Sequence, residues 1–123
     1  MSITTALVDI EIQNNGTWQD AFQFGDVNDT SWSFTGQNFR MDIKGNRDQT
    51  VALLTLTSSG GTIVVDDPDQ RILHVNVPDT TITTDLPVGE YIYDLIMFDG
   101  ATPPIRIPLM AGTLIVHQGI TGN

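Results

Sequence analysis

The segment GEYIYDLIMFDG (residues 89–100) carries the strongest β-strand signal in the chain. Its alternate residues form two faces, and a strand half exposed to water should have one apolar and one polar face. Here both faces are apolar apart from Asp94: one holds Tyr91, Tyr93, Leu95 and Met97, and the other holds Ile92, Ile96 and Phe98. The segment therefore predicts a strand whose second face needs a cover.

Shorter strand signals continue outward from this segment in both directions. The clearest is FRMDIK (39–44), in which Phe39, Met41 and Ile43 face inward and the charged residues face outward. Further segments with a period of two are residues 6–13, 17–24, 31–34, 50–57, 62–65, 71–77 and 105–117. Pro108 and Gly112 interrupt the last segment, where we expect a bend or an edge position. Residues 78–88 (PDTTITTDLPV) read as a connection with one helical turn.

About nine short strands in 123 residues predict an all-β fold in a single domain, residues 1–123. An antiparallel β-sandwich with an immunoglobulin-like Greek key is the first choice, and a small barrel is the second. The chain has no cysteine, so neither a disulfide framework nor a thiolate metal site can form.

The chain is acidic, with 15 Asp and Glu against 5 Lys and Arg, a net charge of −10. A field of this sign repels phosphates, so we expect no nucleic-acid partner. No apolar run is long enough to span a bilayer, and the N-terminus lacks the pattern of a signal peptide. We therefore expect no membrane association and synthesis in a cytoplasm.

Catalytic and cofactor motifs are not evident, and the sequence predicts a protein that is not an enzyme and uses no cofactor. The two histidines, His74 and His117, fit surface or strand-end positions. Two acidic segments, residues 26–29 and 66–69, have oxygen ligands that calcium prefers, but ordinary solvated turns explain them as well. Asp94 has apolar neighbours in its strand, which predicts a buried carboxylate bonded to backbone amides or to an arginine such as Arg106.

The C-terminal third resembles small β-sandwich proteins of tailed bacteriophages and prophages, including N-terminal domains of baseplate upper proteins. Such proteins carry L-x-x-G-x-Y-x-Y-D-L, which Leu86, Gly89, Tyr91, Tyr93, Asp94 and Leu95 match. They then carry a second block, matched by Leu109, Gly112, Leu114, Val116, Ile120 and Thr121. The family also has a proline-containing stretch after its second strand, and this sequence matches that stretch only at Thr35-Gly36.

The resemblance implies a structural virion protein of the tail, baseplate or neck, made in the bacterial host cytoplasm and present in many copies. Its partners would be other virion proteins and copies of itself. We expect contacts from Tyr91, Tyr93, Met97, Phe98 and Ile105. Two alternatives remain: a head-decoration protein on the capsid, and a carbohydrate-binding module using Trp18 and Trp32 with the tyrosines.

Two explanations are open for what covers the second apolar face of residues 89–98. A neighbouring element or subunit would cover part of it, as an assembly component requires. Otherwise the strand is central, and the Thr-rich connection at residues 78–88 caps its outer face.

Overall fold

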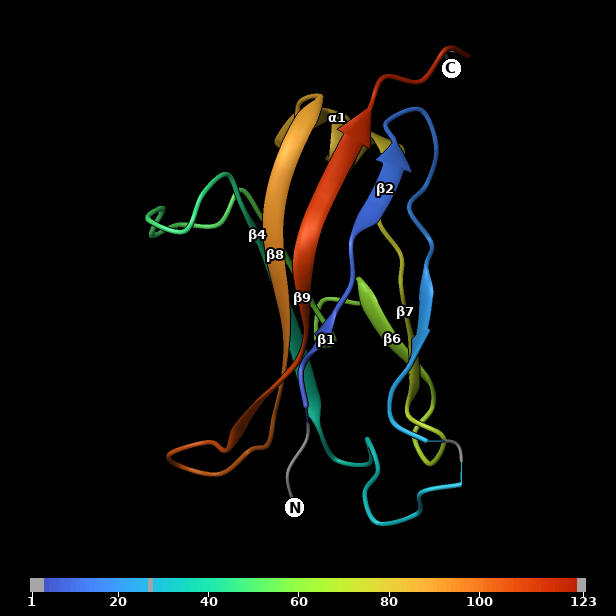
Figure 1. Ribbon diagram of the computed structural model, residues 1–123, viewed down its shortest axis with the longest axis vertical. Helices are drawn as coiled ribbons and strands as arrows, with labels where there is room; N and C mark the ends of the chain where they lie inside the picture. Colours follow the sequence, from blue (N-terminus) through green and yellow to red (C-terminus); the bar gives the residue numbers. More distant parts are fainter. Residues whose placement is uncertain (1–3, 27, 122–123) are drawn as a thin grey trace.

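The computed structural model describes residues 4–26 and 28–121 as two β-sheets packed face to face (Figure 1). Nine strands and one helix, α1 (Asp79–Asp85), make up the described part. The larger sheet contains β1 (Ala6–Leu7), β2 (Ile10–Gln13), β4 (Asn38–Lys44), β5 (Leu54–Thr57), β8 (Gly89–Phe98) and β9 (Arg106–His117). The smaller sheet contains β3 (Ala21–Gln23), β6 (Ile63–Asp67) and β7 (Ile72–Val75). The predicted all-β sandwich is confirmed.

The larger sheet has the order β1-β9-β8-β4-β5, with β2 also beside β9, and the smaller has β3-β7-β6. All pairs are antiparallel except those of β1 and β2, which run parallel to β9. This pairing differs from the all-antiparallel expectation. It joins the start of the chain to its last strand and places β8 in the interior of the larger sheet.

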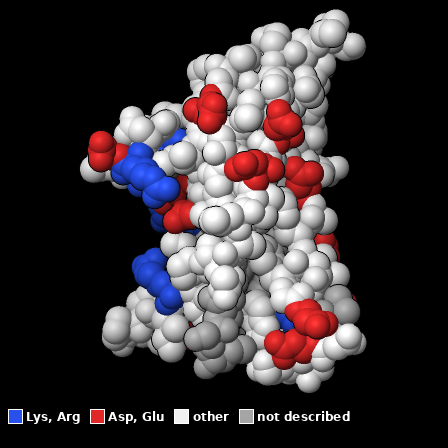
Figure 2. Space-filling model, in the orientation of Figure 1, with Lys and Arg blue, Asp and Glu red and all other residues white. Residues whose placement is uncertain are grey.

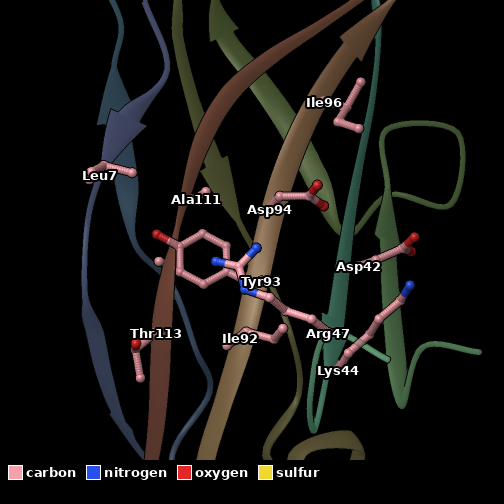
Figure 3. A pocket seen from close by; sticks show the side chains of 11 residues that line it. Leu7, Asp42, Lys44, Arg47, Ile92, Tyr93, Asp94, Ile96, Ala111 and Thr113 are labelled. Atoms are coloured by element: carbon pink, nitrogen blue, oxygen red, sulfur yellow. The ribbon is translucent and has the colours of Figure 1, made fainter. Parts of the chain in front are cut away.

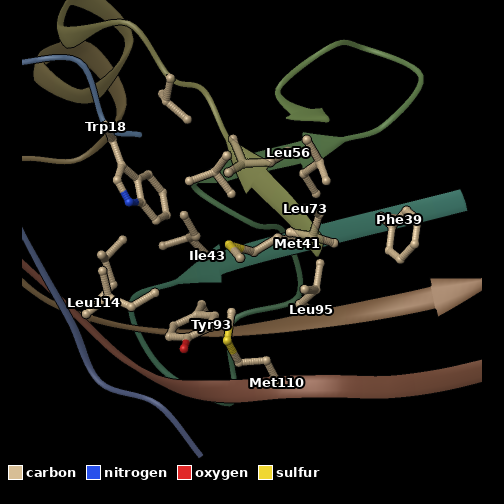
Figure 4. Close-up of a cluster of buried hydrophobic side chains, with 14 of the residues drawn as sticks. Trp18, Phe39, Met41, Ile43, Leu56, Leu73, Tyr93, Leu95, Met110 and Leu114 are labelled. Carbon is tan, nitrogen blue, oxygen red and sulfur yellow. The ribbon is translucent and has the colours of Figure 1, made fainter. Parts of the chain in front are cut away.

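The core lies between the sheets, and the odd-numbered residues of β8 point into it (Figure 4). Tyr93 and Leu95 pack there with Met41 of β4 and Leu73 of β7. Burying one such aliphatic side chain contributes about 1.5–3 kcal/mol. The inward residues predicted for β4, namely Phe39, Met41 and Ile43, are all buried, so that face assignment is correct.

The corner between α1 and β8 is closed by Tyr91, whose hydroxyl donates a hydrogen bond to the Pro87 carbonyl. A tyrosine bonded to backbone just upstream is a hallmark of immunoglobulin-type Greek-key sandwiches. Ile82 and Leu86, four residues apart, anchor the helix side of this corner in the core. The seven-residue α1 is longer than the single turn that the sequence predicted.

The segment SWSF (31–34) is a loop, not the predicted strand, and Arg71, directly before β7 in the smaller sheet, organises it. The Arg71 guanidinium is fully buried and donates five hydrogen bonds to backbone carbonyls, three of them in this loop region at Asp26, Asp29 and Trp32. It also lies 5.1 Å from the Trp32 ring centre. The Trp32 carbonyl, which a strand would pair with a neighbouring strand, is thus satisfied by a side chain.

Two further boundaries differ from, or refine, the sequence expectations. β5 begins at Leu54, so the first part of residues 50–57 belongs to the β4–β5 loop. The register of β9 against β8 shifts between Met110 and Pro108, so the strand is irregular at Pro108, as expected. Gly112 pairs regularly with Tyr93, and β9 is not an edge strand, so the rest of that expectation is wrong. Gly112 lies where the edge strand comes closest: a Cβ there would be 2.0 Å from the Val8 carbonyl oxygen.

Candidate functional site

A groove of about 460 Å³ lies on the outer face of the larger sheet, away from the core (Figure 3). We call it the outer groove. It runs across β1, β9, β8 and β4 and takes one residue from the β4–β5 loop. Its lining consists of Leu7, Asp42, Lys44, Arg47, Ile92, Tyr93, Asp94, Ile96, Ala111, Gly112 and Thr113.

The hollow arises because small residues of β9 lie beside large ones of β8. Ala111 and Thr113, the register partners of Asp94 and Ile92, give β9 little height on this face, while Ile92 and Ile96 rise from β8. Gly112 pairs with Tyr93 and therefore faces the core side of the sheet, where the Val8 carbonyl occupies the space of a side chain. The same carbonyl accepts a hydrogen bond from the Tyr93 hydroxyl, which holds the edge strand against β9.

The charged residues of the groove lie on its β4 side and balance one another. Lys44 and Arg47 provide two positive charges, and Asp42 and Asp94 provide two negative charges. In Figure 2 most of the visible Lys and Arg side chains gather on the left, beside β4 and its following loop, while the acidic ones are spread more widely. The groove is therefore charge-balanced in a chain whose net charge is −10.

Asp94 is exposed on the outer face, so its predicted burial is wrong. The apolar residues next to it in sequence point into the core, whereas its neighbours on its own face, Ile92 and Ile96, are only half-buried. Partial desolvation raises the pKa of Asp94, the nearby Asp42 charge raises it further, and Lys44 acts in the opposite direction. Arg106 lies farther along the sheet, 5.8 Å from the Phe98 ring centre, and is not the partner of Asp94.

The five residues predicted to make contacts fall into two groups. Tyr91, Tyr93 and Met97 are at most 8% exposed, so as core residues they are unavailable to a partner, which corrects the prediction. Phe98 is half-buried on the outer face and Ile105 is 64% exposed. These two lie close together, because the Asp99 amide donates a hydrogen bond to the Ile105 carbonyl in the β8–β9 turn.

Both histidines pair with carboxylates at the surface. His74 Nδ1 lies 2.8 Å from Asp66, and His117 Nε2 lies 3.0 Å from Glu11. In the acidic segments, the Asp67 carboxylate accepts hydrogen bonds from the Asp69 and Gln70 amides. Within residues 4–26 and 28–121, no group of three His, Asp or Glu side chains could hold a metal ion; Val27, in the other acidic segment, lies outside them.

The tryptophans do not form an open aromatic platform. Trp18 is 3% exposed, and its indole N–H donates to Asp20 at 2.7 Å. Trp32 is half-buried between Arg71 and Phe34, whose ring centre is 5.9 Å away. Trp18 is therefore unavailable for stacking on a sugar ring, and Trp32 is only partly accessible.

The outer groove was only partly visible in the sequence. The apolar second face of residues 89–98 indicated Ile92 and Ile96, which do line it. Leu7, Ala111 and Thr113 gave no signal, because their place beside β8 depends on the parallel pairing of β1 with β9. Lys44 and Arg47 read as ordinary turn and strand-end charges.

No protein-family model matches the chain, and no curated protein matches it in sequence. No helix among the described residues is long and apolar enough to cross a bilayer.

Proposed function

We propose that the chain is a non-enzymatic assembly component that docks on neighbouring proteins through the outer face of its larger sheet. One observation carries this proposal: apolar side chains remain accessible on that face around a preformed groove. Leu7 is 85% exposed, and Ile92 and Ile96 are half-buried in the lining of the groove. Accessible apolar surface bordered by charges is typical of protein–protein contacts.

The structure also bears on the two readings of the cover for this face. The Thr-rich connection forms α1 and ends at the Tyr91 corner, where Ile82 and Leu86 enter the core. Its buried residues thus cover one end of the sandwich. The middle of β8, around Asp94, stays open to solvent. This arrangement favours a neighbouring subunit as the cover.

We propose further that the assembly is the virion of a tailed bacteriophage, in its tail, baseplate or neck. The resemblance of residues 86–95 and 109–121 supports this assignment. Part of that resemblance has a structural cause, since Leu86, Gly89 and Tyr91 build the corner that Greek-key sandwiches share. The particle assignment therefore depends on the second block of matches, and the docking function depends on the outer groove.

Two alternatives differ in how the structure bears on them. A head-decoration protein would use the same docking face on a capsid. It would differ from a tail, baseplate or neck component only in its position in the particle. A carbohydrate-binding module would need accessible aromatic rings, but Trp18, Tyr91 and Tyr93 are buried. The assembly component is the better supported function.

Electron microscopy of purified phage particles bearing a tagged copy tests this function. We expect label at the tail tip, baseplate or neck, whereas label over the head would identify a decoration protein. Ile96→Asp in the outer groove should abolish incorporation. Val64→Asp, on the exposed face of the smaller sheet, is the matched control and should leave it intact. Particles without label anywhere would refute the virion assignment.

A further inference from the structure

We propose that the outer groove binds a second copy of this chain, with the two larger sheets packed face to face about a twofold axis. This inference rests on the proposed function and names the partner of its docking face. In a twofold interface the same patch lies on both subunits, so the patch must be complementary to itself. The outer groove meets this condition in charge, in polarity and in size.

Charge is the first argument. Two copies at −10 each repel one another over most of their surfaces. The groove lining holds two cations and two carboxylates, a net charge of zero, so it is a place where two copies can meet without net repulsion. A twofold axis through the groove brings Lys44 and Arg47 of each copy toward Asp94 of the other.

The groove charges are also available for such pairing. Among the described residues, Lys44, Arg47 and Asp94 form no ion pair, whereas Asp42 accepts hydrogen bonds from Arg40 at 3.1 Å and from Thr55 at 2.8 Å. Asp94 instead has the like charge of Asp42 as its register partner. A cation from a second copy would relieve that repulsion and fix the register of the two subunits.

The apolar residues provide the second argument. Leu7, Ile92 and Ile96 present accessible aliphatic surface on a face that residues 4–26 and 28–121 leave at least partly exposed. Next to them, the short side chains of Ala111 and Thr113 leave a depression. Large residues beside a depression on one face allow two identical faces to interdigitate, as side chains do between packed sheets.

The dimensions of the face agree with a dimer interface. Ten residues of β8 at about 3.3 Å each give a length of about 33 Å, and five strands spaced about 4.8 Å apart give a width of about 19 Å. The flat area is about 600 Å² before side-chain relief is added. The smallest specific protein interfaces cover about 600 Å² on each partner, so this face reaches the lower end of their range.

Sedimentation equilibrium of the full chain from 1 to 200 µM tests the proposal. We expect the wild-type mass to double with concentration. Asp94→Lys and the double variant Lys44→Glu/Arg47→Glu should each raise the dimer dissociation constant at least tenfold, because like charges then meet across the axis. Mixing these two variants at 1:1 should restore the dimer as a heterodimer, since their groove charges are opposite.

Asp69→Lys is the matched control, because it makes the same change of charge in the exposed turn after β6. It should dimerise like the wild type, and near-ultraviolet circular dichroism should show that every variant is folded. A wild-type chain that stays monomeric to 200 µM would overturn the inference. So would a dimer that survives both groove variants. A monomer that still labels phage particles would refute this inference alone and leave the proposed function standing.

Discussion

Asp42 and Asp94 are register partners on neighbouring antiparallel strands, so two carboxylates lie side by side on the outer face of the larger sheet. Like charges directly opposite in a sheet are destabilising. Desolvation and the Asp42 charge both raise the pKa of Asp94 above its ordinary value. The ionised form of Asp94 is therefore disfavoured in the folded chain.

We predict that Asp94→Asn stabilises the isolated chain at pH 7 by about 0.5 kcal/mol. Because the folded pKa is raised, the wild type loses stability as pH rises through it, and the gain of the variant should vanish below pH 3. Urea unfolding in dilute solution measures both effects. A variant less stable than the wild type at pH 7 would show that the carboxylate has a stabilising partner.

Gly112→Ala should destabilise the fold, because its new methyl group would lie 2.0 Å from the Val8 carbonyl oxygen. The edge strand would have to move away, and the Tyr93 hydroxyl would lose its acceptor. We expect a loss of about 2–3 kcal/mol in the free energy of unfolding in urea. Gly16→Ala is the control, since no atom lies within 4 Å of its added carbon. Equal effects of the two variants would contradict the close approach.

Arg71→Met should cost about 3 kcal/mol or more, because five carbonyl hydrogen bonds are lost in the interior. The loss of stability in Arg71→Lys should be smaller than in Arg71→Met but still measurable, since an ammonium group has fewer donors than a guanidinium and no planar fork. Trp32 should become more exposed, which a red shift of tryptophan fluorescence would report. Arg106→Met, at an exposed position, is the matched control and should change stability by less than about 0.5 kcal/mol.

The raised pKa of the Tyr93 hydroxyl predicts that the folded chain loses stability in alkaline solution. Burial, with a smaller contribution from the Asp9 charge, raises its pKa to about 12 from the ordinary value of 10. The folded chain then holds the hydroxyl proton more tightly than the unfolded chain, so stability falls as pH rises from 10 to 12. The loss should be on the order of 2 kcal/mol. Tyr93→Phe should flatten this pH dependence, and an unchanged slope would assign it to other groups.

The sequence predicted the strands whose inward residues alternate regularly, and these are the strands of the core. FRMDIK became β4 with the expected inward face, and residues 89–98 became β8. The face of a strand depends only on its own periodicity, which local sequence contains. The order of the strands depends on partners far away, so the parallel pairing of β1 and β2 with β9 left no local trace.

The errors at Asp94 and at SWSF have the same physical origin. Asp94 seemed buried because its immediate neighbours are apolar, but those neighbours belong to the opposite face of β8. Residues 31–34 had a strand pattern, but Arg71, far along the chain, satisfies the carbonyls around them. In DQRIL an arginine looks like an ordinary turn residue, and only tertiary structure shows its burial.

The parallel pairing of β1 and β2 with β9 also governs when the domain can fold during its synthesis. Ile10 pairs with Leu114, so the edge of the larger sheet waits for a segment made about a hundred residues later. Until that segment leaves the ribosome, the first strands have no partner, and β8 has an open edge that other nascent chains could join. Closure of this edge is thus a late folding step with high contact order, and it should take milliseconds to seconds.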